Sequence, residues 1–140
     1  MAQRVIKKHL RIHNDVRQLS ELAGFVDDAV AGTDLDKSLV LAINLALEEA
    51  VTNVVLYAYP EGTDGLVDIE AILQAGALTF VVSDSGSPFD PTAKPDADIS
   101  LGVEDRPIGG LGIFLVRQIM DSVSYEYTGG KNILTMTKNI

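Results

Sequence analysis

The sequence predicts an α+β protein, a two-layer α/β sandwich in which helices cover one face of a mixed, mostly antiparallel sheet. Five segments alternate apolar and polar residues as strands do, and three others repeat apolar residues at helical spacing. Their order is strand, helix, helix, strand, strand, loop, helix, strand, strand, which favours three helices on one face. With 140 residues and no internal repeat, residues 1–140 are expected to form a single domain.

The N-terminal part of the chain predicts one strand and one helix. Residues 4–12 alternate loosely and carry several basic side chains, as an edge strand does. Asn14 is the expected N-cap of the following helix, with Asp15 in its first turn. Helical spacing continues to Ala31, and Gly32 is a stop signal.

Residues 39–59 predict a long, mostly apolar central helix, which ends before Pro60 because the residue preceding a proline disfavours helix. Glu49 and Asn53 are four residues apart, so they lie on the same side of this helix, beside its apolar face. Glu48 is expected to face solvent.

The rest of the chain predicts two hairpins, a loop and a helix. Residues 84–107 lack periodicity, and a loop of this length is either a lid, about residues 90–107, or a disordered insertion. Residues 109–112 open a helix that continues to Ser122. The remaining four strands are predicted at residues 66–73, 77–83, 122–127 and 132–137.

Composition narrows the classes of function. The chain has no cysteine, which excludes disulfides and thiolate chemistry, and its net charge of -9 argues against binding nucleic acid backbones. No apolar run is judged long enough to span a bilayer, and the basic start lacks the apolar region of a secretory signal, so no membrane association is expected. His9 and His13 are the only histidines, and solvated surface positions are expected for both.

Three short segments carry candidate chemistry. A carboxylate and an amide at the edge of a core, as at Glu49 and Asn53, suit a hard cation or a proton transfer, or else form a surface pair bonded to a loop. Asp84 follows an apolar strand, where it can accept a hydrogen bond from a ligand amine or simply form a turn. The glycines of residues 109–112 precede a helix, which suits a phosphate cradle, a hinge or tight packing.

Together, the segments EEAVTN, DSGSPFDP and RPIGGLG resemble, in order, the conserved boxes of the Bergerat-fold ATPases, the superfamily that includes gyrase, histidine kinases and MutL. Within that superfamily the chain is most similar to the small anti-sigma-factor serine/threonine kinases. The resemblance covers the chain from about Leu39 to its C-terminus, and it implies a Bergerat-type ATP-binding fold.

The resemblance also implies roles for individual residues. Asn53 matches the asparagine that binds Mg²⁺ between the phosphates, and Glu49 matches the glutamate that acts as general base. Asp84 matches the aspartate that reads adenine, and Gly86 matches the glycine that lets adenine approach. The remaining implied nucleotide contacts are the glycines beside the lid and an arginine near the terminal phosphate: Gly109, Gly110, Gly112 and Arg106.

The function implied is an ATP-dependent serine protein kinase and anti-sigma factor. Such a protein would be cytoplasmic and homodimeric, would phosphorylate an anti-anti-sigma partner using ATP and Mg²⁺, and would sequester a sigma factor. The alternative is an ATP-gated protein-binding module of a partner switch without kinase activity. The chain departs from the superfamily pattern at Ser87 and Pro88, where a glycine is common, and at Lys131-Asn132, which receive no assigned role.

Overall fold

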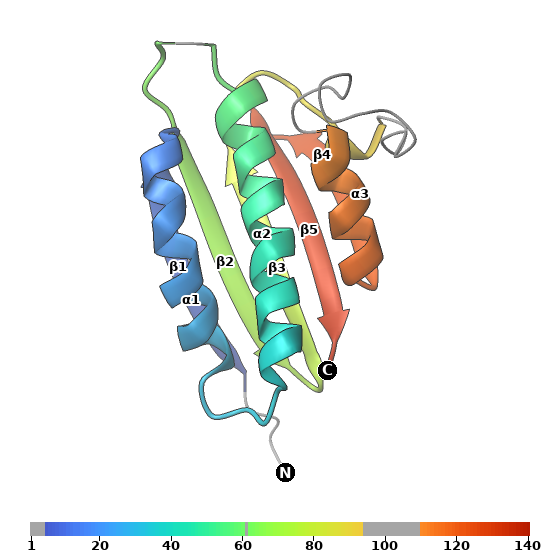
Figure 1. Cartoon of the computed structure of the whole chain (residues 1–140). Coiled ribbons are helices and arrows are strands. Elements are labelled where there is room, and N and C mark those ends of the chain that lie inside the picture. Colours follow the sequence, from blue (N-terminus) through green and yellow to red (C-terminus); the bar gives the residue numbers. More distant parts are fainter. Residues whose placement is uncertain (1–4, 61, 94–109) are drawn as a thin grey trace.

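A single sheet of five strands, in the order β1-β2-β3-β5-β4, forms one layer of the protein (Figure 1). The computed structural model describes residues 5–60, 62–93 and 110–140. All four pairings between neighbouring strands are antiparallel. The sheet of the described residues is therefore antiparallel throughout, whereas the sequence predicted a mixed sheet. The strands are β1 (Ile6–His13), β2 (Leu66–Gln74), β3 (Ala77–Asp84), β4 (Ser122–Thr128) and β5 (Lys131–Asn139).

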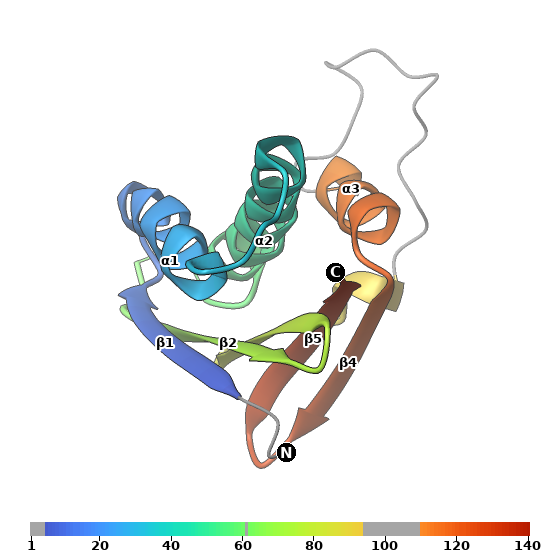
Figure 2. The ribbon, with the colours of Figure 1, turned by 90° about the horizontal axis from the view of Figure 1, so that it is seen from below.

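Three helices form the second layer, all on the same face of the sheet (Figure 2). They are α1 (Glu21–Val30), α2 (Lys37–Tyr57) and α3 (Gly110–Ile119), with short 3₁₀ turns η1 (Val16–Ser20) and η2 (Pro91–Ala93). This arrangement confirms the predicted α+β two-layer architecture. Helix α3 ends three residues before the predicted Ser122, which instead begins β4.

Helix α2 is the central element of the helical layer. Its inner face packs into the core and is buried, whereas Glu48 is exposed as predicted. By length and composition alone α2 could cross a membrane, so the prediction that no run is long enough was wrong. In the structure it is a packed core helix whose buried residues are Ile43, Ala46, Leu47, Ala50, Val51, Asn53, Val54 and Val55.

Buried and partly exposed residues alternate strictly along β3, which defines the inner face of the sheet. Every second residue of β3 is buried, because the helices cover only one face and the other face stays partly open. The alternation places two polar residues, Asp84 and Asn132, at inward positions of β3 and β5 among apolar neighbours.

Both predicted hairpins form around residues with positive φ. Ala75 and Gly76 have φ values of 52° and 76°, and Gly129 and Gly130 have values of 60° and 77°. Two successive left-handed residues give a turn whose twist matches that of antiparallel strands. These turns fix the registers of β2 against β3 and of β4 against β5, and Asp84 lies opposite Asn132 in the separate β3–β5 pairing.

The cap of the first helical segment differs from the prediction. Asp15, not Asn14, is the N-cap, and its carboxylate accepts the Arg17 backbone N–H at 2.9 Å. Hydrogen bonds from the Arg17 side chain and backbone lower the pKa of Asp15 to about 2. Asn14 instead bridges to the chain before β2, since its Oδ1 accepts the Gly65 N–H at 2.9 Å. Sequence position alone could not distinguish this long-range partner from a local cap.

Both histidines lie at exposed positions, as expected. His9 Nε2 lies 2.9 Å from Asp68 Oδ1, and His13 Nδ1 lies 2.9 Å from Asp64 Oδ1. Each pair joins β1 to β2 or to the turn preceding it, so these histidines have structural partners at the sheet edge.

Candidate functional site

One side of α2 carries the two candidate residues Glu49 and Asn53, and Tyr57 continues their line at the same interval of four residues. Glu49 is partly exposed and Asn53 is only 3% exposed. The Tyr57 ring contacts the Phe89 ring, with centroids 5.6 Å apart and planes inclined at 30°. This side of α2 therefore faces the segment that follows β3.

Residues 85–87 are fastened to the end of α2. The Ser87 N–H donates to the Ala58 carbonyl at 2.8 Å. The Tyr59 hydroxyl accepts the Ser85 N–H at 2.9 Å and donates to the Leu66 carbonyl at 2.7 Å. Because Asn53 precedes Ala58 by five residues, about 7.5 Å along the helix axis, Asn53 and this segment lie at the same end of α2.

Asp84 and Asn132 form a buried polar pair on adjacent strands. They are directly opposite in the β3–β5 register and are 3% and 5% exposed. Asp84 Oδ1 accepts from Asn132 Nδ2 at 3.0 Å and from the Gly86 N–H at 2.8 Å. Asn132 is the main residue that sequence reasoning left without a role. The signal was present, because alternation with Leu134 and Met136 places Asn132 at an inward position.

Burial also shapes the charges of the site. Desolvation raises the pKa of Asp84, and the hydrogen bonds from Asn132 and Gly86 oppose that rise. Desolvation, followed by the nearby charge of Glu48, raises the pKa of Glu49. No ion pair found within the described ranges includes Asp84 or Glu49. The site therefore holds two carboxylates whose charge is poorly compensated by the chain itself, which suits a bound cation or hydrogen-bond donor.

Replacing Glu49 by glutamine should stabilise the ligand-free fold at neutral pH. A raised folded-state pKa means that the charged carboxylate is less stable in the folded protein than in the unfolded chain. The advantage of Glu49→Gln should shrink as the pH falls through that raised pKa, because the wild-type carboxyl then becomes neutral. Melting curves of both proteins at neutral and mildly acidic pH check this. An advantage that stays constant with pH would contradict it.

Asn53 is buried without a hydrogen-bond partner for its side chain. No such bond to its amide occurs among residues 5–60, 62–93 and 110–140. The Asn53 amide atoms are not among the fully enclosed, unpartnered side-chain atoms of the described residues, so a ligand, water or ion can complete their hydrogen bonds. An amide oxygen is a suitable ligand for Mg²⁺, which also retains waters and takes phosphate oxygens. Asn53 thus fits the metal-binding position predicted for it.

Gly86 is required by the fold itself. A Cβ at this position would lie 2.3 Å from the Ala58 carbonyl oxygen, a contact that backbone atoms cannot relieve by rotation. This close packing is a reason for glycine that is separate from the room for adenine implied by the resemblance. It holds the segment after β3 against the end of α2.

Replacing Gly86 by alanine should destabilise the fold by about 1–3 kcal/mol or more, because the extra methyl group forces the two backbones apart. Gly24→Ala is the matched control. Gly24 lies within α1 with open space around its Cβ position, so alanine there should stabilise the helix by about 0.5–1 kcal/mol. Chemical unfolding of both variants measures the difference. An unfolding free energy of Gly86→Ala equal to that of the wild type would contradict the packing argument.

The remaining predicted residues are placed only in part. Gly110 and Gly112 lie in the first turn of α3, where backbone N–H groups lack helical acceptors and the helix dipole is positive. Arg106 and Gly109 lie outside the described residues. The predicted lid lies there too, apart from residues 90–93, whose last three form η2.

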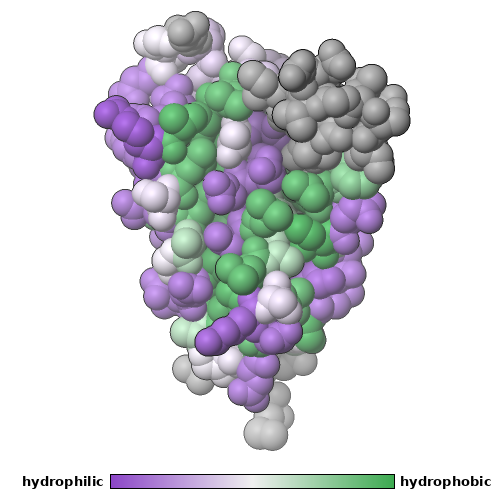
Figure 3. All heavy atoms as spheres, in the orientation of Figure 1, coloured by the Kyte–Doolittle hydropathy of each residue, from purple (hydrophilic) through white to green (hydrophobic). Residues whose placement is uncertain are grey.

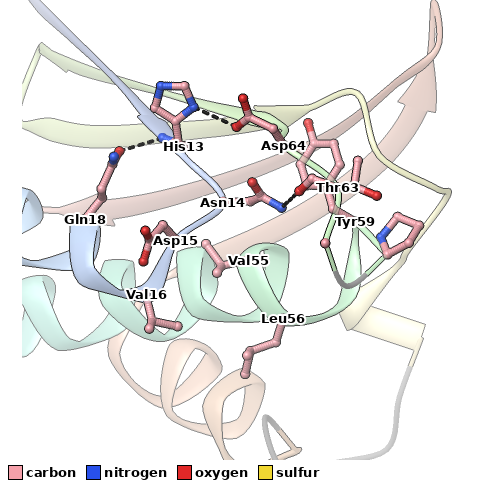
Figure 4. A pocket seen from close by; sticks show the side chains of 12 residues that line it. His13, Asn14, Asp15, Val16, Gln18, Val55, Leu56, Tyr59, Thr63 and Asp64 are labelled. Carbon is pink, nitrogen blue, oxygen red and sulfur yellow. Dashed lines mark hydrogen bonds and ion pairs between the residues drawn. The ribbon is translucent and has the colours of Figure 1, made fainter.

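A surface pocket of about 920 Å³ lies near the same end of α2 but has different walls (Figure 4). It is lined in part by Val16, Val55, Leu56 and Tyr59, and by none of Glu49, Asn53 and Asp84. The polar groups on its rim bind one another, as in the His13–Asp64 pair drawn in Figure 4. The geometry therefore places the candidate chemistry outside this pocket.

Comparison with known proteins supports a nucleotide-binding family. The family described as "Histidine kinase-like ATPase domain" matches residues 12–138. The chain is 36% identical over 102 residues to a protein named serine-protein kinase RsbW from Listeria monocytogenes, across 70% of this chain and 64% of that protein. It is 27% identical over 101 residues to one named serine/threonine-protein kinase BtrW from Bordetella bronchiseptica, across 72% and 71%.

A solved structure has the same fold. The RsbU and RsbW domains of Rv1364c from Mycobacterium tuberculosis align with a TM-score of 0.67 and 16% identity, covering 96% of this chain and 32% of that chain. The match to the Listeria kinase spans less than two thirds of that protein's length. The family match, in contrast, extends from the end of β1 to the end of β5 and includes every described side chain of the candidate site. The chain therefore belongs to the histidine kinase-like ATPase domain family.

Proposed function

We propose that this protein binds Mg-ATP and transfers its terminal phosphoryl group to a serine of an anti-anti-sigma protein. The observation that carries the proposal is the unpartnered, buried Asn53 amide, which lies one turn after a desolvated carboxylate, Glu49, on the side of α2 that faces the segment after Asp84. The names of the relatives, serine-protein kinase RsbW and serine/threonine-protein kinase BtrW, support the same reaction class.

In this proposal each residue of the site has one task. Asp84 accepts a hydrogen bond from the adenine amine, and the Asn53 amide oxygen holds Mg²⁺. The bound nucleotide supplies the phosphoryl group, and Mg²⁺ neutralises charge on its phosphates. Glu49 orients the incoming serine hydroxyl and takes its proton, for which a raised pKa is suited. The N–H groups of Gly110 and Gly112 contact the phosphates, as do Arg106 and Gly109, and Gly86 keeps the base-binding segment against α2.

We further propose that the protein sequesters a sigma factor in competition with its substrate, acts as a cytoplasmic homodimer, and contacts neither nucleic acid nor membrane directly. An exposed apolar stripe on α2 supports contact with protein partners. Leu41, Leu45 and Leu56 share its outward side and are 69%, 41% and 41% exposed. Figure 3 shows apolar patches along the middle of this face, with hydrophilic residues between them. Apolar surface of this kind is typical of protein interaction sites when it forms a continuous patch.

The proposal is tested by incubating the protein with Mg-ATP and a purified anti-anti-sigma protein, then measuring the mass of the latter. We expect a gain of one phosphoryl group on a serine, and a gain that is about 10²–10⁴-fold slower with Glu49→Gln. An unmodified partner in the presence of saturating, bound ATP would favour the alternative, an ATP-gated binding module without kinase activity. In that case ATP should still change the affinity for the partner.

A further inference from the structure

The Asn132 side chain uses its full hydrogen-bonding capacity within the protein. Its Nδ2 donates to Asp84 Oδ1 at 3.0 Å and to the Ser87 carbonyl at 2.8 Å. Its Oδ1 accepts the Phe89 N–H at 2.9 Å and the Tyr125 hydroxyl. An amide has two donor hydrogens and two acceptor lone pairs, so none remains for a ligand. Asn132 is therefore built to hold other groups in place rather than to bind a ligand itself.

These partners also fix the orientation of the amide. Reversing it would place the NH₂ group against the Phe89 N–H, and the amide oxygen against both Asp84 Oδ1 and the Ser87 carbonyl. The reversed amide would therefore place a donor against a donor at Phe89, and an acceptor against an acceptor at Asp84 and at Ser87, in a buried site. Only one arrangement satisfies all the contacts, and Asn132 is 5% exposed, so water cannot easily replace any of them.

The consequence falls on the Asp84 carboxylate. Its Oδ1 accepts two hydrogen bonds, from Asn132 Nδ2 and from the Gly86 N–H. These two bonds restrain rotation of the carboxylate about the Cβ–Cγ bond of Asp84. Its Oδ2 has no hydrogen-bond partner within the part of the chain that the structure describes. The two oxygens therefore differ: one is held by the protein and the other remains available.

We propose that Asn132 is a positioning residue for purine selectivity, which fixes Asp84 so that Oδ2 accepts a hydrogen bond from the exocyclic amine of adenine. This inference rests on the proposed nucleotide site. The same side chain binds Ser87 and Phe89, and the Phe89 ring contacts Tyr57 on the functional side of α2. One buried amide thus sets both the carboxylate that reads the base and the segment that forms the adjoining wall.

Calorimetric titration with Mg-ATP and with the Mg complex of purine riboside triphosphate, which lacks the exocyclic amine, tests the proposal. Wild-type protein should prefer ATP, and Asn132→Asp should reduce ATP affinity about 10–100-fold, the cost of a lost or misdirected charged hydrogen bond. Affinity for the analogue should change much less, so the ratio of the affinity for ATP to the affinity for the analogue should approach one in Asn132→Asp. Asn139→Asp is the matched control, because Asn139 is an exposed asparagine on the same strand.

Tyr125→Phe separates positioning from simple stability. It removes one donor to Asn132 Oδ1 but leaves both Nδ2 contacts, so it should lower the melting temperature and keep the preference for ATP. A folded Asn132→Asp protein with wild-type preference would overturn the proposal. If wild-type protein binds neither nucleotide, the proposed nucleotide site itself fails.

Amide exchange in the ligand-free wild type gives a readout that needs neither a variant nor a nucleotide. The Asn132 side-chain NH₂ protons should exchange slowly in NMR spectra, whereas those of Asn139 should exchange at the rate of a solvated amide. Fast exchange at Asn132 would overturn the proposal even if every variant failed to fold.

Discussion

Glu49→Gln is expected to reduce phosphoryl transfer by about 10²–10⁴-fold while Mg-ATP affinity changes little. Glutamine keeps the shape and hydrogen-bonding reach of the side chain but cannot take a proton from serine. Glu49 is half-buried and its pKa is raised by desolvation, which brings its proton affinity closer to that needed at neutral pH. The measurement is the transfer rate at saturating ATP, together with calorimetric affinity.

Glu48→Gln is the control for that experiment. Glu48 is adjacent in sequence, but its exposed side chain points away from the line formed by Glu49, Asn53 and Tyr57. The control should retain transfer at close to the wild-type rate. Wild-type transfer by Glu49→Gln would show that another group accepts the proton. Loss of transfer in both variants would assign the effect to the charge of α2 rather than to Glu49.

Asn53→Ala is expected to weaken Mg-ATP binding by about 10–100-fold, the usual cost of removing a group that holds or orients a metal ion. The same change should leave the ligand-free protein at least as stable, because the buried Asn53 amide has no hydrogen-bond partner among the residues described here. Affinity is measured by calorimetry and stability by thermal unfolding.

Asn44→Ala is a matched control for Asn53→Ala. Both asparagines lie on α2, nine residues and therefore about two and a half turns apart, which places them on opposite sides of the helix. The Asn44 Oδ1 atom is enclosed without a hydrogen-bond partner among the described residues, and each substitution removes one side-chain amide from α2. Only Asn53→Ala should weaken nucleotide binding. Equal losses would indicate that the helix as a whole, rather than the site, had been disturbed.

The parts of the fold predicted correctly are those determined by local sequence. Helix α2, the strands and both hairpin turns follow from apolar periodicity and from glycines at left-handed positions. The first helix cap was misassigned because Asn14 binds Gly65, a partner distant in sequence.

The candidate site could be predicted only where a single segment carries it. Glu49 and Asn53 were recognised because they are one helical turn apart, and Asp84 because it ends an apolar strand. Asn132 received no role, since its partners come from three separate segments and depend on the register between β3 and β5. The packing of Gly86 on Ala58 was hidden for the same reason.

Calorimetric titration of the intact protein with Mg-ATP, Mg-ADP and Mg-GTP tests the central claim most directly, namely that Asn53 and Asp84 belong to one adenine nucleotide site. We expect saturable binding of both adenine nucleotides, weak or absent binding of Mg-GTP, and reduced affinity in Asn53→Ala. Failure of the folded protein to bind any of the three, or equal affinity for the adenine and guanine nucleotides, would contradict the claim.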